Sequence, residues 1–180
     1  MSKVKDMGLA SEGRKLLNWA ESNMPVLSSI RERFQREKPL SGIRVGVALH
    51  LEKKTGILLE TLVAGGAEVS AASCNPLTTD DRIAAAVADK INVFAWTGQN
   101  EDEYYDCLKL VINSKPQITI DDGCDLIHLL HTKFLDQLSG VIGGCEETTT
   151  GIVRLNAMKN DGELKFPVMA VNNAHSKYLF

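Results

Sequence analysis

Paired cysteines and long apolar runs are both missing from this sequence of 180 residues. Its four cysteines are scattered singly, without the C-x-x-C spacing that is typical of zinc sites and redox pairs. No segment has the apolar length of a signal peptide or of a membrane span. Because scattered thiols without a secretion signal are most simply reduced, we expect a cytoplasmic protein with no membrane attachment.

Excess positive charge and recognisable metal-ligand spacing are missing as well. The formal net charge is −3 and the pI is about 5.8, which argues against a surface for nucleic acid or anionic lipid. His128, His131 and His175 have no carboxylate at ligand spacing, so they are interpreted as structural and no metal site is predicted. With 44% hydrophobic residues, the chain is long enough for one domain, residues 1–180, with a sizeable core.

Apolar segments alternate with helical patterns along the chain. Two helices are predicted over 9–37, divided at Met24-Pro25, because proline fits the first turn of a new helix. Strands are expected at 43–49, 68–73, 92–96, 118–120, 140–143 and 168–171, with helices at 53–63, 80–88, 101–113, 125–135 and 149–159. This alternation predicts an α/β fold, an open, mostly parallel, Rossmann-like sheet with helices on both faces, preceded by the two N-terminal helices.

The stretch 118–151 carries most of the candidate chemistry. One apolar run ends in Asp121-Asp122-Gly123, and a second ends in Glu146-Glu147 before three threonines. Carboxylates and glycine at strand ends are typical of α/β ligand sites, and the spacing predicts that the two pairs lie at neighbouring strand ends. The other interpretation is local: the acids could cap or complement the helices that follow them.

The order DDGCDL followed by EETTTG resembles the substrate domain of the S-adenosylhomocysteine hydrolases (adenosylhomocysteinases). In that family an aspartate pair and a glycine precede a glutamate pair and three threonines, and the resemblance extends along nearly the whole chain. It implies that residues 1–180 are the N-terminal substrate-binding domain. The family's NAD-binding domain would be absent, because no G-x-G-x-x-G motif occurs in this chain.

The resemblance implies four catalytic residues: His50, Asp122, Glu147 and Lys177. His50 would line the site near the leaving sulfur, Asp122 would transfer a proton at C4′, and Glu147 would hold the ribose hydroxyls. From the residues alone, a histidine at a strand end can exchange a proton near neutral pH, although a plain surface histidine is the alternative. Lys177, close to the last residue, carries no signal without the resemblance.

The resemblance also implies contacts to substrate and cofactor. The substrate residues would be Glu52, Thr55, Cys74, Asn75 and Asp125, and the residues that reach the nicotinamide cofactor would be Thr148, Thr149 and Thr150. Two positions depart from the family pattern. Glu52 stands where many members have a threonine that faces the adenine, and Asp80 stands where a glutamine is usual.

The implied activity is the reversible, NAD-dependent hydrolysis of S-adenosyl-L-homocysteine to adenosine and L-homocysteine, in an enzyme expected to be a homotetramer. Bound NAD would oxidise the 3′-hydroxyl, which acidifies the C4′ proton before homocysteine is eliminated and water is added. The 180 residues alone are expected to be inactive. The alternative is a non-catalytic module that binds adenosine or S-adenosylhomocysteine, or a subunit that pairs with a separate NAD-binding partner; calorimetry with adenosine, with and without NAD, would distinguish them.

Overall fold

The structure is a computed structural model that describes residues 2–178. Its centre is a seven-stranded sheet in the order β1-β4-β3-β2-β5-β6-β7, and every neighbouring pair is parallel. The strands are β1 (Lys3–Val4), β2 (Arg44–Leu49), β3 (Glu68–Ser73), β4 (Asn92–Ala95), β5 (Ile118–Asp121), β6 (Gly143–Glu146) and β7 (Val168–Ala170). The predicted open, parallel α/β sheet is therefore confirmed.

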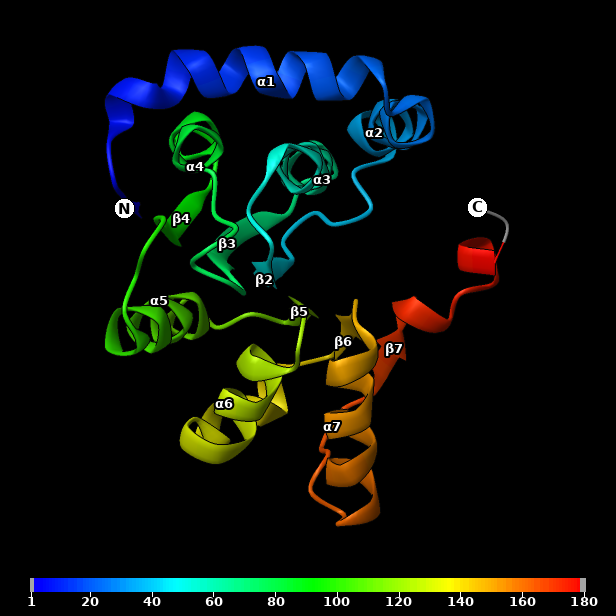
Figure 1. Ribbon diagram of the computed structural model, residues 1–180. Helices are drawn as coiled ribbons and strands as arrows, with labels where there is room; N and C mark the ends of the chain where they lie inside the picture. Colours follow the sequence, from blue (N-terminus) through cyan, green and yellow to red (C-terminus); the bar gives the residue numbers. More distant parts are fainter. Residues whose placement is uncertain (1, 179–180) are drawn as a thin grey trace.

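Helices cover both faces of the sheet, as predicted (Figure 1). On one face α3 and α4 lie against the strands, and α1 and α2 pack on their outer side; α5, α6 and α7 lie on the opposite face. The helices are α1 (Ala10–Ser22), α2 (Pro25–Glu37), α3 (Lys53–Ala64), α4 (Asp81–Val87), α5 (Glu101–Asn113), α6 (Asp125–Lys133) and α7 (Thr149–Asn160). Short 3₁₀ segments lie at Met7–Leu9, Leu135–Gly140, Val171–Asn173 and His175–Tyr178.

Local sequence explains where several elements begin. Pro25 occupies the first turn of α2, where the amide that proline lacks would have had no helical partner. Asn100 and Glu103 form a reciprocal capping box at the start of α5. The central strand β2 is buried on both faces from Val45 onward, which explains its uninterrupted apolar sequence.

The strand order places a switch point at the centre of the sheet. From β2 the chain runs outward through β3 and β4, and then returns to the other side of β2 to continue through β5, β6 and β7. In open α/β sheets, ligands bind beyond the carboxyl ends of the strands at the place where the direction of winding reverses. In this chain that place lies between β2 and β5.

The strand expected at 140–143 is wrong in position. Leu135–Gly140 forms a 3₁₀ segment, and β6 runs instead over Gly143–Glu146, so that the first acid of the glutamate pair belongs to the strand. Its glycines allow close packing: a Cβ on Gly144 would lie 2.5 Å from the Thr119 hydroxyl on β5. The two-residue strand β1, which pairs with β4, was not predicted from the sequence. In residues 2–178 no helix combines the length and apolar character needed to cross a bilayer.

Candidate functional site

Four parallel strands deliver polar side chains to one edge of the sheet. His50 directly follows β2, Cys74 follows β3, Asp122 follows β5 and Glu147 follows β6. Because the strands are adjacent and parallel, their carboxyl ends lie side by side. The site is therefore assembled from residues that are far apart in sequence but come from one line of strand ends.

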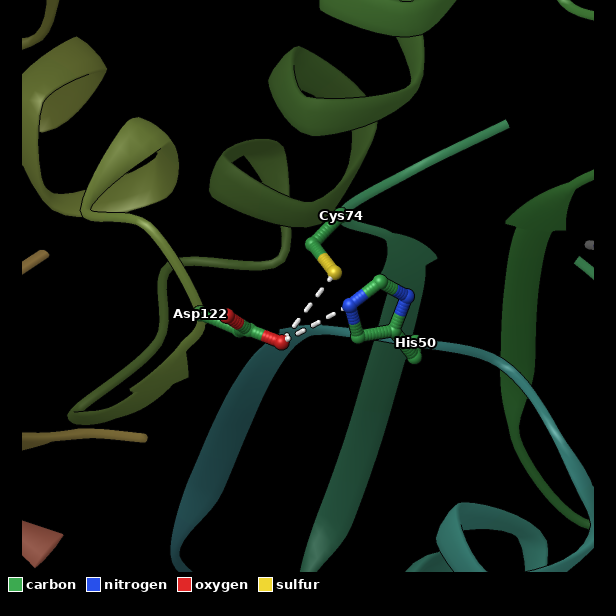
Figure 2. Close-up of side chains that lie close together, drawn as sticks. All are labelled: His50, Cys74 and Asp122. Carbon is green, nitrogen blue, oxygen red and sulfur yellow. Dashed lines mark hydrogen bonds and ion pairs between the residues drawn. The ribbon is translucent and has the colours of Figure 1, made fainter. Parts of the chain in front are cut away.

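His50, Cys74 and Asp122 point toward one another at the switch point (Figure 2). The Nε2 atom of His50 lies 3.4 Å from Oδ2 of Asp122, and the Sγ atom of Cys74 lies 3.5 Å from the same oxygen. On its other side, the His50 ring is held through Nδ1, which lies 2.5 Å from the Thr78 hydroxyl. The imidazole is thus oriented so that Nε2 faces the carboxylate.

The environment of Cys74 favours its neutral form. Burial raises the pKa of the Cys74 thiol above its usual range, and the adjacent charge of Asp122 adds to that effect. The thiol can therefore donate a weak hydrogen bond to the carboxylate rather than act as a nucleophile. In contrast, the His50 side chain is 46% exposed, which leaves the imidazole accessible from solvent.

Within each acid pair, the first residue is buried and holds backbone. Asp121 accepts the amides of Asp122 at 3.0 Å and Ile127 at 2.9 Å, and burial raises its pKa to about 8 although the Ile127 amide opposes the shift. Glu146 accepts the amides of Gly123 at 2.8 Å and Thr148 at 3.1 Å through Oε1. Burial also raises the pKa of Glu146. These two acids fix the loops that follow β5 and β6.

The second glutamate faces the last described segment of the chain. Lys177 Nζ lies 2.8 Å from Oε1 of Glu147 and also donates to the Asn172 side chain at 3.0 Å. Asn172 in turn donates to the Thr149 hydroxyl at 2.8 Å. Glu147, Lys177 and the start of α7 therefore form one polar network beside the first cluster.

The predicted threonines lie at the N-terminus of α7. Thr148 is the N-cap residue, but its side chain makes no capping hydrogen bond, and Thr149 and Thr150 form the first turn. The amides at a helix N-terminus have no partner within the helix, so this turn can offer N–H and hydroxyl groups to a polar ligand.

The remaining predicted substrate residues have varied settings. Glu52 caps α3, and its Oε1 accepts the amides of Lys54 at 2.9 Å and Thr55 at 3.3 Å. Asn75 shapes the loop after β3 by accepting the Leu77 amide at 2.9 Å. Asp125 begins α6, and its carboxylate accepts hydrogen bonds from the groups described next.

Four residues of these networks were not singled out from the sequence. Arg154 contacts Asp125 at 2.6 Å and also donates to the Gly123 carbonyl, while the Tyr104 hydroxyl donates to Asp125 at 2.9 Å. Thr78 and Asn172, described above, position His50 and Lys177. Thr78 lies between Asn75 and Asp80, two positions that the resemblance already marked, but the others come from elements whose facing surfaces no sequence spacing reveals.

The sequence model of the S-adenosyl-L-homocysteine hydrolase family matches residues 1–139 and 130–180, which together cover the chain. The chain belongs to this family. The resemblance expected from the DDGCDL and EETTTG segments is thereby confirmed.

Two of the similar proteins are named for S-inosyl-L-homocysteine, whereas the family is named for S-adenosyl-L-homocysteine. The S-inosyl-L-homocysteine hydrolase of Methanocaldococcus jannaschii is 56% identical over 181 residues, 100% of this chain and 44% of its own length. The protein with the same name in Methanopyrus kandleri is 53% identical over 177 residues, 98% of this chain and 42% of its own. The adenosylhomocysteinase of Sulfolobus acidocaldarius is 51% identical over 179 residues, 99% of this chain and 43% of its own. This family member thus spans less than half the length of these relatives.

Proposed function

We propose that this chain is the substrate-binding part of a hydrolase that cleaves the carbon–sulfur bond of a purine nucleosyl-L-homocysteine. The observation that carries the proposal is the convergence of His50, Cys74 and Asp122 at the switch point of the sheet. Family membership supports thioether hydrolysis as the reaction. A site of this kind needs proton-transfer groups next to groups that hold a sugar; His50 and Asp122 can serve as the first kind, and Glu147 and Lys177 as the second.

The two polar networks suit two different tasks. Asp122 is placed to exchange the C4′ proton of the ribose, and His50, oriented by Thr78, is placed to deliver a proton near the departing sulfur. The Glu147–Lys177 pair supplies a carboxylate that can accept from the ribose hydroxyls and an ammonium group that can donate to them. These roles assign proton transfer to one pair and orientation of the sugar to the other.

The family's reaction depends on NAD, which when bound supplies the hydride acceptor and donor. The first turn of α7 fits a role beside that cofactor, because its N-cap side chain leaves the amides of the turn without a capping bond. Thr148, Thr149 and Thr150 would hold one edge of the cofactor at this turn. We expect the 180 residues to bind substrate but not to turn it over without the rest of the enzyme.

We further propose that the base of the substrate is hypoxanthine, so that the substrate is S-inosyl-L-homocysteine. The relatives from M. jannaschii and M. kandleri that are named for this substrate support the proposal. Glu52 also supports it, because the resemblance places position 52 against the base. One carboxylate oxygen of Glu52 holds the start of α3, and the other can only accept a hydrogen bond. Hypoxanthine offers an N1–H donor to such an acceptor, whereas adenine presents a lone pair at N1.

S-adenosyl-L-homocysteine is the second candidate. The relative from S. acidocaldarius named adenosylhomocysteinase is 51% identical, and the adenine amino group could also donate to Glu52. The two candidates differ in the orientation that the base must take beside a carboxylate that is fixed at a helix N-terminus.

The test is a comparison of kcat/KM for both thioethers with the rest of the enzyme and NAD present. We expect the inosyl substrate to be preferred, and we expect Glu52→Gln to reduce that preference about tenfold, because an amide can donate as well as accept. Glu68→Gln is the matched control, since Glu68 is exposed at the opposite, amino end of β3. A preference for the adenosyl substrate would reverse the assignment of the base, and absence of hydrolysis with both would refute the proposed function.

A further inference from the structure

The cluster at the switch point combines three kinds of metal ligand. Within residues 2–178, His50, Cys74 and Asp122 form the one group of three or more histidine, cysteine or acidic residues whose ligand atoms all lie within 4.8 Å of one another. They follow β2, β3 and β5, which are far apart in the sequence, so their spacing does not match a metal-ligand motif (Figure 2).

Two of the three distances between the ligand atoms agree with those of a tetrahedral site, and the third is within 4.8 Å. Zinc bonds of about 2.3 Å to sulfur and about 2.0–2.2 Å to nitrogen and oxygen give tetrahedral edges of about 3.3–3.6 Å. The edge between His50 Nε2 and Asp122 Oδ2 is 3.4 Å, and the edge between Cys74 Sγ and Asp122 Oδ2 is 3.5 Å. The distance from His50 is long for an N–H···O hydrogen bond, the distance from Cys74 is ordinary for a thiol donor, and both fit two ligands that share one small cation.

His50 has the second-nitrogen hydrogen bond that is typical of metal-binding histidines. Metal-bound histidines almost always use their second ring nitrogen for a hydrogen bond that fixes the tautomer. In this chain Nδ1 of His50 is 2.5 Å from the Thr78 hydroxyl, and Nε2 is the atom that faces Cys74 and Asp122. Thr78 itself is held by the Asn75 carbonyl at 3.1 Å. The histidine is thus preorganised with the correct nitrogen toward the cluster.

We propose that His50, Cys74 and Asp122 form a three-ligand site for a divalent metal that favours thiolate and imidazole, such as Zn²⁺, with its fourth position open. Nitrogen and sulfur ligands disfavour Mg²⁺ and Ca²⁺, which take oxygen ligands. The thiol gives up its proton when the metal binds. Occupation removes the imidazole and the carboxylate from proton transfer, so metal binding and the proposed hydrolysis exclude one another.

The experiment uses the untagged chain and Co²⁺, which reports the geometry of a zinc site through its visible spectrum. We expect about one Co²⁺ per chain, with the intense visible bands of tetrahedral coordination and a thiolate-to-cobalt charge-transfer band. Zn²⁺ should displace the Co²⁺ and abolish the spectrum. This readout does not depend on hydrolysis, so it can fail or succeed independently of the proposed function.

Variants separate the proposed ligands from other thiols. Cys74→Ser should remove the charge-transfer band and most of the affinity, whereas Cys145→Ser, at a half-buried thiol on β6, should leave both unchanged. Thr78→Val keeps all three ligands but removes the support of His50, and should weaken the affinity about 10–100-fold. Circular dichroism verifies that each variant is folded. Absence of Co²⁺ binding, an octahedral spectrum, or an unchanged spectrum in Cys74→Ser would overturn the proposal.

Discussion

The two acid pairs, Asp121–Asp122 at the end of β5 and Glu146–Glu147 at the end of β6, are arranged in the same way: the first acid contacts backbone and the second contacts a side chain. In each pair the first acid is completely buried and accepts two backbone amides. The second acid lies beyond the strand and faces another polar side chain: Asp122 faces His50, and Glu147 faces Lys177. The first carboxylate of each pair thus stabilises the following loop, and the second is available to other polar groups.

The difference within each pair follows from the strand geometry. Asp121 and Glu146 are the last residues of their strands and lie opposite one another in the register of β5 and β6. Successive side chains of a strand point to opposite sides, so the next residue leaves the core. The local interpretation is therefore correct for the first member of each pair, and the ligand-binding role of the second member remains a prediction.

The largest effect is expected from the exposed member of the first pair. With the rest of the enzyme and NAD present, Asp122→Asn should lower the turnover of nucleosyl-homocysteine about 10²–10⁴-fold, because the amide cannot act as a general base. Its thermal midpoint should stay close to that of the parent protein. Asp106→Asn on α5, which removes an exposed acid paired with Lys109, is the control and should keep its activity. Near-normal turnover in Asp122→Asn would show that the proton is transferred by another group.

The buried member of the same pair should matter for stability. Asp121→Ala leaves the amides of Asp122 and Ile127 without their acceptor in the core, and we expect the free energy of unfolding to fall by about 2–4 kcal/mol. Asp122→Ala, a step further along the chain, should cost less than about 1 kcal/mol. Urea denaturation of both variants measures the difference. Equal losses would mean that the two aspartates do not differ as described.

Much of the fold could be predicted because it depends on local patterns. The apolar runs of β2 and β3 and the capping residues of α5 specify their elements without help from the rest of the chain. The strand β6 could not be placed in this way. Its Gly143-Gly144 sequence is typical of a turn, and it becomes a strand because it pairs with β5 and β7. Glycine is required at position 144 because Thr119 on β5 leaves no room for a side chain.

The candidate site was predictable only as a set of strand ends. Residue order and family resemblance indicated His50, Asp122, Glu147 and Lys177, and the structure brings them together as two pairs, His50 with Asp122 and Glu147 with Lys177. Their roles in catalysis remain predictions. The residues that orient them, Thr78 and Asn172, depend on loop conformation and could not be found from periodicity.

The smallest expected effect concerns the pH dependence that the buried glutamate imposes. Burial raises the pKa of Glu146 above its usual 4.5, and Oε2 of its carboxyl is buried without a hydrogen-bond partner among the described residues. The folded chain therefore keeps this proton to a higher pH than the unfolded chain does. The resulting contribution to stability is fully present below pH 4.5 and is lost as the pH rises through the folded pKa.

Glu146→Gln removes this titration while keeping an oxygen for the amides of Gly123 and Thr148. Above pH 4.5 the parent chain should lose stability relative to the variant, with a slope of at most about 1.4 kcal/mol per pH unit, as measured by urea denaturation across the pH range. Glu147→Gln removes the same charge from the neighbouring, half-exposed position and should retain the decline of the parent. If both variants followed the parent curve, Glu146 would be ionised in the fold, and the two members of the pair would differ in position but not in charge.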